Sequence, residues 1–327
     1  MCILEDDVYY RLERCGRPLG LRFDNRGYLN VIDPYYGIFR VNATTGHKKS
    51  LGLAPNDKNL PAAWRGLYND FVFDPTNQNI MYVTVSSTKW GLHEVPWSLN
   101  EHENSGLLLA VELRSGKVIK LADGLYFTNG VEVSADNKYL LYSQCTNYTI
   151  SKIDLEAARK ALSTNDVSKI IPEIFTENLP GEPDNIRLHD GNILVGIAIG
   201  RSKGTVYVKD YVTAFPVVRK AVGRLVYLTS VVLDFVRTTM WSHPAMEEVV
   251  FKLKSGHLFY SGLPTSSAVV VIDGTSGNLK TILGSSKFNA ISEAIIDEST
   301  GDLYFGSFKN RFIGKLSAAD FKSAIEK

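Results

Sequence analysis

Four polar residues with side-chain oxygen atoms stand where β-rich segments of the sequence begin: Asn69, Asn129, Asp184 and Asn185. Asn and Asp are disfavoured in strands, and burying such a group without a hydrogen-bond partner costs roughly 1–3 kcal/mol. Amide and carboxylate oxygens are ligands that Ca²⁺ accepts in a tolerant geometry. Their recurrence at equivalent positions therefore predicts a Ca²⁺ site. For any single Asn, a hydrogen bond to a neighbouring segment is the alternative.

The same residues predict a reaction, the hydrolysis of a small ester or lactone by water. A bound Ca²⁺ polarises a carbonyl oxygen and stabilises the negative charge that develops on it. Asp184 is the carboxylate of the predicted ligand set and a candidate catalytic base, although a carboxylate that binds a cation is a weaker base. Glu293, near the start of a further β-rich segment, is the second candidate catalytic base.

Each of these β-rich segments opens a copy of one hairpin pattern, which has an apolar run, a turn containing Asp, Asn or Gly, and a second β-rich run. The copies begin at Arg17, Tyr68, Thr128, Pro183 and Ile291. The first four starts lie about 50 to 60 residues apart, which suits a four-stranded sheet, and radial repetition of such sheets forms a β-propeller. We therefore expect an all-β propeller. Since the first strand of each blade lines the channel of a propeller, side chains that open equivalent strands converge there.

The interval between the last two copies is long enough to hold an insertion. Residues 201–251 change to helical spacing, with apolar side chains three and four positions apart, which predicts a helical insertion within a single domain of residues 1–327. Basic residues such as Lys220 and Arg224 interrupt the apolar stripe. Three roles are open for it: residues 205–236 lie on a membrane surface, the insertion covers the channel as a lid, or it packs against the propeller.

The composition indicates a folded chain without a strong overall charge. The 36 Lys and Arg residues nearly balance the 35 Asp and Glu residues, which argues against a nucleic-acid partner. The hydrophobic share of 44% and the aromatic share of 11% exclude a disordered chain. The sequence contains no stretch of about 18 uncharged apolar residues, so it predicts no membrane-spanning helix. Short helices are predicted at Asp154–Leu162 and after the capping pattern that begins at Ser317.

The cysteines and two short motifs bear on the compartment. Cys2 and Cys15 are close enough in sequence to form a disulfide if the compartment is oxidising, whereas Cys145 lies in a β-rich run as a small apolar residue. N-glycosylation acceptor sequences begin at Asn42 and Asn147. Both lie near predicted strand ends, where a glycan would project into solvent.

Several ordered motifs between about Cys15 and Leu316 resemble the strictosidine synthase-like branch of the calcium propellers. They are Cys15-Gly-Arg-Pro-Leu-Gly20, Asn69-Asp-Phe71, Ser86-Ser-Thr-Lys-Trp90, Thr128-Asn-Gly-Val131, Leu179-Pro-Gly-Glu-Pro-Asp-Asn-Ile186 and Tyr304-Phe-Gly-Ser-Phe308. The resemblance implies a six-bladed propeller related to paraoxonases, with Ca²⁺ in the channel and weak arylesterase or lactonase activity. For animal members it also implies an N-terminal membrane anchor ahead of a glycosylated domain on the lumenal or extracellular face, in the secretory pathway.

The resemblance places the family's metal ligands at the four residues named first, Asn69, Asn129, Asp184 and Asn185. Three departures are visible. The family's glutamate ligand from the first blade has no equivalent in this chain, and Leu19 stands where paraoxonases carry a catalytic histidine. Ser292 stands at the position of the catalytic glutamate of strictosidine synthases, with Glu293 one residue later. Ser292 argues against strictosidine synthase activity, and the missing histidine argues against a lactonase mechanism that uses a histidine dyad.

A six-bladed ring needs a blade before the first hairpin copy, and the fourteen residues before Cys15 are too few to form one. We therefore expect this chain to lack most of the first blade, together with the membrane anchor, and the helical insertion to lie in the fifth blade. Two functions follow as hypotheses. One is a calcium-dependent, arylesterase-like hydrolase. The other is a non-catalytic, membrane-associated propeller that binds a partner, because propellers serve both purposes.

Overall fold

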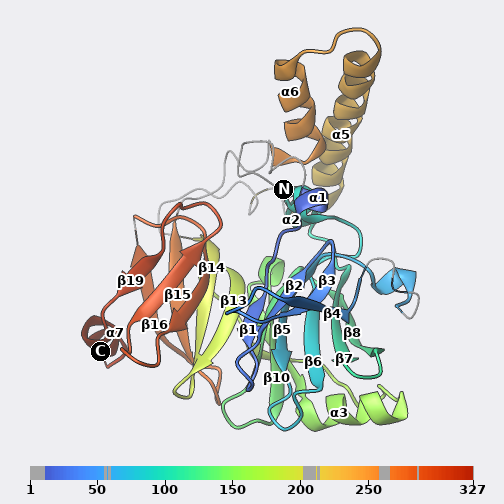
Figure 1. Ribbon diagram of the computed structural model, residues 1–327. Coiled ribbons are helices and arrows are strands. Elements are labelled where there is room, and N and C mark those ends of the chain that lie inside the picture. The colour runs from blue at the N-terminus through green and yellow to red at the C-terminus, as the bar shows by residue number, and fades with distance from the viewer. Residues whose placement is uncertain are drawn as a thin grey trace.

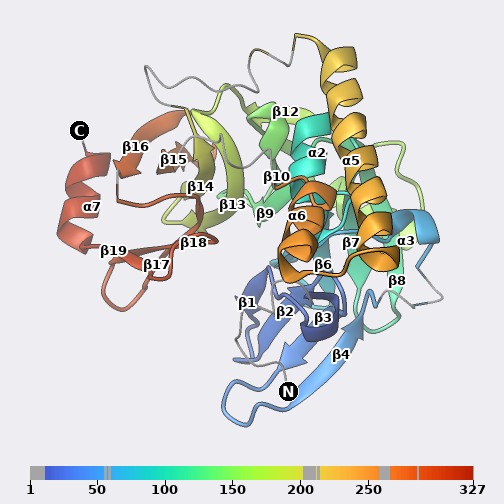
Figure 2. The same ribbon diagram turned by 90° about the horizontal axis from the view of Figure 1, so that it is seen from above.

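The computed structural model describes residues 12–54, 57, 60–201, 211, 214–257, 266–285 and 287–326. Its framework is a series of antiparallel sheets that follow one another along the chain, four with four strands and a last one with three (Figure 1). Within each sheet the strands neighbour one another in chain order. Seen from above, the sheets form an arc (Figure 2). The predicted all-β propeller architecture is confirmed. The described residues supply five sheets, so the sixth blade stays a prediction.

The strands have the following bounds. The first sheet contains β1 (Leu21–Phe23), β2 (Leu29–Asp33), β3 (Gly37–Val41) and β4 (Lys48–Gly52). The second contains β5 (Tyr68–Phe73), β6 (Ile80–Val85), β7 (Gly106–Glu112) and β8 (Lys117–Leu125). The third contains β9 (Thr128–Val133), β10 (Tyr139–Gln144), β11 (Thr149–Asp154) and β12 (Glu173–Thr176). The fourth contains β13 (Gly181–His189), β14 (Asn192–Gly200), β15 (Ser267–Asp273) and β16 (Leu279–Ser285), and the last contains β17 (Ile291–Ile296), β18 (Leu303–Ser307) and β19 (Gly314–Leu316).

The helices lie between these strands. They are α1 (Leu12–Cys15), α2 (Val95–Glu101), α3 (Leu155–Thr164), α5 (Pro216–Thr239), α6 (Pro244–Lys254) and α7 (Ala318–Ile325), with short 3₁₀ turns at Ala62–Trp64, Leu92–Glu94 and Cys145–Asn147.

Each predicted hairpin copy forms the first two strands of a sheet, and local turn chemistry explains why. In four of the five turns an aspartate carboxylate accepts hydrogen bonds from backbone N–H groups of the turn. These residues are Asp24, Asp74, Asp136 and Asp297. An Asp side chain that satisfies the backbone two residues later fixes the reversal of the chain. The positions of these hairpin turns can therefore be predicted from the sequence.

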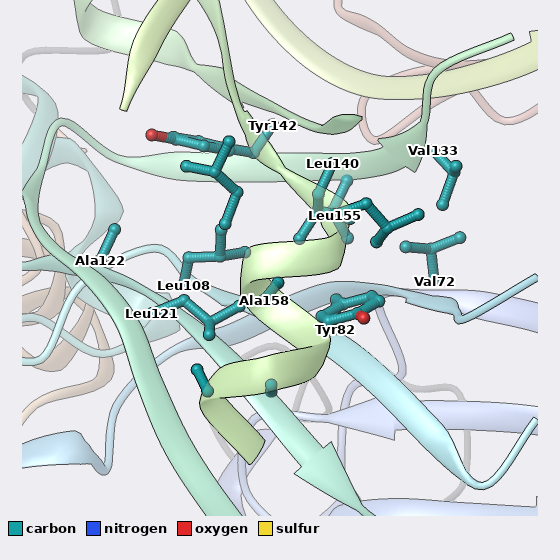
Figure 3. Close-up of a cluster of buried hydrophobic side chains, with 14 of the residues drawn as sticks. Val72, Tyr82, Leu108, Leu121, Ala122, Val133, Leu140, Tyr142, Leu155 and Ala158 are labelled. Carbon is teal, nitrogen blue, oxygen red and sulfur yellow. The ribbon is translucent and has the colours of Figure 1, made fainter. Parts of the chain in front are cut away.

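The hydrophobic core lies between neighbouring sheets and beneath α3. The first strands of successive sheets contact one another, β5 with β9, β9 with β13, and β13 with β17. In one cluster Tyr82, Leu108 and Leu140 pack against Leu155 and Ala158 of α3 (Figure 3). The helix begins where the Asp154 carboxylate accepts a hydrogen bond from Ala157 N at 2.6 Å, an N-cap at the residue where the helix was predicted to start.

Helices α5 and α6 interrupt the fourth sheet between β14 and β15, in the segment whose spacing predicts helices. They pair with each other and project away from the sheets (Figure 1). Their base is held by α2, because the buried Trp97 donates from Nε1 to Lys254 O at 2.8 Å and its ring packs edge-on against Tyr227. Among the described residues, no helix is long and apolar enough to pass through a lipid bilayer.

Candidate functional site

The predicted site residues lie at irregularities in the pairing of the first strand of a sheet with the second. The register between β5 and β6 shifts between Tyr68 and Phe71, and that between β9 and β10 shifts across the residues from Thr128 to Val131. The register between β13 and β14 shifts between Pro183 and Ile186. A β-bulge takes residues out of the ladder and redirects their side chains. The residues released in this way are Asn69, Asn129, Asp184 and Asn185.

Two of these residues have a buried oxygen atom without a partner. The Oδ1 atoms of Asn129 and Asn185 are buried and accept no hydrogen bond from the described residues. An unsatisfied carbonyl oxygen in a buried position is unfavourable, and a bound cation satisfies it. This is the donor chemistry that Ca²⁺ requires.

Asp184 lies beside them as a buried carboxylate. Burial raises the pKa of Asp184 well above its ordinary value, and the nearby charge of Glu293 raises it further, while a hydrogen bond with Asn129 acts in the opposite direction. Without a cation, such a carboxyl group tends to keep its proton. A bound cation would favour the ionised form. The two orphaned oxygens and this carboxylate together fit a cation site.

Glu293 of β17 lies close enough to Asp184 for their charges to interact. Its Oε2 atom accepts a hydrogen bond from Arg187 Nη2 at 2.6 Å, whereas Oε1 is buried and has no partner among the described residues. Burial raises the pKa of Glu293 to about 7, with Arg187 lowering it and the charge of Asp70 raising it. A carboxyl group with a pKa in this range suits proton transfer near neutral pH.

Asn69 is held differently from the other predicted ligands. Its Nδ2 atom donates to Ser86 Oγ at 2.8 Å, and Ser86 Oγ donates in turn to Thr128 O at 2.7 Å. The side chain thus connects β5, through Ser86, to the neighbouring sheet. The sequence analysis gave such a hydrogen bond to a neighbouring segment as the alternative to metal binding for a single Asn, and Asn69 makes one.

A glycine allows β9 and β13 to approach at the site. A Cβ atom at Gly130 would lie 2.4 Å from Ile186 N and 2.7 Å from Asn185 Cα, both backbone atoms. Only a residue without a side chain fits at this distance. Gly130 therefore brings Asn129 next to the bulge that carries Asp184 and Asn185.

Beside these residues lies an ion-pair network, of which only Glu293 was predicted from the sequence as a site residue. Each first strand contributes one charged residue: Arg22 from β1, Asp70 from β5, Glu132 from β9, Arg187 from β13 and Glu293 from β17. Arg22 bonds to Glu132 at 2.9 Å and approaches Asp70 to 3.4 Å. Arg187 bonds to Asp70 at 2.7 Å and to Glu293 at 2.6 Å. We call these five residues the channel network.

The channel network carries more negative than positive groups. Burial alone would raise the pKa of the fully buried Asp70, but the charges of Arg187 and Arg22 outweigh it and hold that pKa below its ordinary value. With all groups ionised, three carboxylates face two guanidinium groups, and Asp184 adds a further negative charge nearby. A cation at the site would offset this excess.

A recurring signal could have revealed the network. Every hairpin copy places one charged residue inside its apolar first run, as Glu132 lies between Val131 and Val133. By contrast, the described residues hold no group of three or more His, Cys, Asp and Glu side chains suited to a metal ion. A cation site that includes Asp184 would therefore take its other ligands from amide or backbone oxygens.

The remaining predicted sites stay predictions. Asn42 lies after β3 and Asn147 in a 3₁₀ turn, and both are partly exposed. Cys2 is outside the described residues, so the pairing of Cys2 with Cys15 is untested. Cys145 is buried, and its thiol donates to Pro183 O at 2.7 Å.

Comparison with known proteins agrees with the resemblance. A family model described as strictosidine synthase matches residues 71–157. The adipocyte plasma membrane-associated protein of Gallus gallus is 30% identical over 306 residues, which cover 93% of this chain and 64% of that protein. The protein of the same name from Homo sapiens is 27% identical over 304 residues, with 93% and 64% covered. The chain thus spans less than two thirds of the length of these relatives.

A solved structure agrees with the fold. A chain of the nidogen–laminin complex matches with a TM-score of 0.51 and 10% sequence identity, covering 92% of this chain and 76% of that chain. At this identity the likeness supports the fold alone.

Proposed function

From the premise that the chain belongs to the strictosidine synthase-like family, we propose that it is a calcium-dependent hydrolase of small esters or lactones. The observation that carries the proposal is the pair of buried, unpartnered oxygens of Asn129 and Asn185 beside the buried carboxyl group of Asp184. Asn129, Asp184 and Asn185 would hold the ion, with Asn69 as the fourth ligand. When bound, Ca²⁺ supplies a Lewis acid for a carbonyl oxygen.

Side chains of the protein would transfer the proton of the attacking water. Glu293, with its pKa raised to about 7, is partly ionised at neutral pH, and its Oε1 atom has no hydrogen-bond partner among the described residues. It takes a proton from the attacking water as the new carbon–oxygen bond forms. The same proton then goes to the leaving oxygen as the ester bond breaks. Arg187 holds Oε2 and thereby fixes the direction of Oε1.

Asp184 is the second carboxyl group of the site and acts mainly as a ligand in this scheme, because a carboxylate on a cation is a poor base. Replacement of Asp184 by Ala should abolish both stoichiometric Ca²⁺ binding and phenyl acetate hydrolysis. Asp166→Ala, which changes an exposed carboxylate in a loop, is the matched control and should leave both unchanged. Full activity in Asp184→Ala would disprove the proposal.

A second candidate function is a non-catalytic propeller in which the ion stiffens the sheets and another surface binds a partner. The channel network favours it, because ion pairs join the first strands of all five sheets and Leu19 stands where paraoxonases have a histidine. A panel of chromogenic esters, assayed with and without a chelator, separates the two. If chelation lowers the melting temperature and no ester is hydrolysed, the binding function holds.

We also propose that the domain lies on the lumenal or extracellular face of a membrane, with glycans at Asn42 and Asn147 and a disulfide between Cys2 and Cys15. The relatives named above are plasma membrane-associated proteins by name. Glycosidase treatment of the chain purified from a secretory host should increase its electrophoretic mobility. An unchanged mobility would exclude the glycans.

A further inference from the structure

The helix α5 has its polar and apolar sides reversed relative to a helix on a folded domain. Its buried residues are Arg219, Gly223 and Ser230. These fall on one side of the helix, because they are spaced by four and seven positions. The helix therefore packs through a polar and small side.

The opposite side of α5 is apolar and exposed. Val217 is 79% exposed, Leu225 65% and Phe235 64%, and Val218, Leu228 and Val232 continue the same stripe. We call these six residues the apolar face of α5. A helix of 24 residues is about 36 Å long, and the apolar face runs along most of it. It is therefore a contiguous exposed apolar surface and not a set of single exposed apolar residues. Such a face indicates contact with an apolar phase or partner.

The exposed charges of α5 that border the apolar face are positive. Lys220 and Arg224 are exposed on its flank. The one carboxylate of α5, Asp234, is paired with Arg237 and with Lys254 of α6, on the side where the two helices pack. Positive flanks with no unpaired carboxylate on α5 complement an anionic surface.

The chemistry of the face indicates lipid more than a second copy of the chain. Two copies that paired through α5 would bring Lys220 and Arg224 into one interface, and the one carboxylate of α5, Asp234, is already paired with Arg237 and Lys254. At the far end of the helix, Met240 and Trp241 are 79% and 58% exposed, and tryptophan is favoured at the boundary between lipid headgroups and acyl chains. The five charged residues of α5 fit a helix that lies along a membrane rather than one that crosses it.

We propose that the apolar face of α5 lies in the headgroup–acyl boundary of an anionic membrane, parallel to the bilayer, with Lys220 and Arg224 against lipid phosphates. This surface is separate from the candidate metal centre, so the inference does not depend on the proposed hydrolase.

The test is flotation of the full chain with vesicles of phosphatidylcholine, alone or with about a third phosphatidylserine. The wild type should float with the anionic vesicles. Leu225→Glu/Val232→Glu should weaken this binding roughly tenfold or more, because two carboxylates replace apolar groups in the boundary. Lys220→Gln/Arg224→Gln should weaken binding to the anionic vesicles roughly thirtyfold, as expected for two lost contacts with anionic lipid.

The matched control is Leu279→Glu/Ile282→Glu, which changes two exposed apolar residues of β16, 52% and 46% exposed, on the sheet away from the helical pair. It should bind vesicles like the wild type. Quenching of Trp241 by brominated lipid, measured against Trp241→Phe, tests docking in the wild type even if a glutamate variant fails to fold.

Three results would overturn the inference: no flotation of the wild type, equal flotation of Leu225→Glu/Val232→Glu, or a wild-type dimer that this variant converts to a monomer. The last would assign the face to a second copy. Phenyl acetate hydrolysis measured without vesicles should be unaffected by these variants. Vesicle binding without any hydrolysis would therefore reject the hydrolase and retain this inference.

Discussion

Arg187→Met is a direct perturbation of the channel network. Arg187 is the partner of Asp70 at 2.7 Å and of Glu293 at 2.6 Å. In the variant the fully buried Asp70 retains Arg22 at 3.4 Å and a hydrogen bond from Val131 N at 3.2 Å. Removing one partner of a buried ion pair costs about 3–5 kcal/mol, because the other charge stays buried without compensation.

The loss should appear in urea unfolding followed by circular dichroism at pH 7 with a chelator present. In thermal unfolding it corresponds to a melting temperature lower by about 4–7 °C for a chain of this size. Adding Asp70→Asn to Arg187→Met should recover at least about 2 kcal/mol, because the uncompensated charge is removed. Arg114→Met, which changes an exposed arginine, should cost less than about 0.5 kcal/mol.

The direction of the pKa shift of Asp70 predicts how the destabilisation by Arg187→Met changes with pH. The pKa of Asp70 is lowered in the folded wild type, so its pairing contributes stability that is present above the ordinary pKa and is lost as the pH falls through the folded value. In Arg187→Met that pKa rises. The difference in stability between the two proteins should therefore shrink as the pH is lowered from 7 towards 4. A loss below about 1 kcal/mol, or a double variant no more stable than Arg187→Met, would refute the reasoning.

Three further predictions concern the site itself. The pKa of Glu293 is raised to about 7 in the ion-free protein, and a bound cation would lower it. Ester hydrolysis should therefore increase as the pH rises towards 7, and Glu293→Gln should remove this dependence, whereas an unchanged profile would exclude Glu293 as the base. The same raised pKa means that the chelated protein loses stability as the pH rises from the ordinary glutamate value through about 7; Glu293→Gln should weaken this trend in melting curves, and Asp184, whose pKa is also raised, accounts for the remainder. Gly130→Ala places a Cβ 2.4 Å from Ile186 N, so it should separate β9 from β13, destabilise the fold by more than about 2 kcal/mol and weaken Ca²⁺ binding; calorimetric titration that gives wild-type affinity would contradict this.

The parts of the fold that could be predicted from the sequence are those fixed by local chemistry. The hairpin copies follow from turns such as that of Asp74, whose carboxylate accepts from the backbone two residues later. The helix α3 follows from its cap at Asp154, and α5 from its apolar spacing. These signals lie within one segment of sequence, so no knowledge of the other sheets is needed.

The geometry of the site could not be predicted in the same way. The bulges that release Asn129 and Asp184 depend on the register between two strands, which the residue types of one strand do not specify. The ion pairs of Arg187 join residues 106 and 117 positions apart. That Asn69 donates to Ser86 while Asn185 keeps an unpartnered oxygen is likewise a property of the packed sheets, although all the Asn residues appear alike in the sequence.

Phenyl acetate hydrolysis during back-titration of the chelated protein with Ca²⁺ tests the metal centre most directly. Activity should return in proportion to bound Ca²⁺ and reach its maximum at one ion per chain, and Asp184→Ala should show neither binding nor activity. Hydrolysis that persists in the chelated protein, or Ca²⁺ binding at one ion per chain in wild type and in Asp184→Ala alike, would contradict a calcium-dependent hydrolase built on Asn129, Asp184 and Asn185.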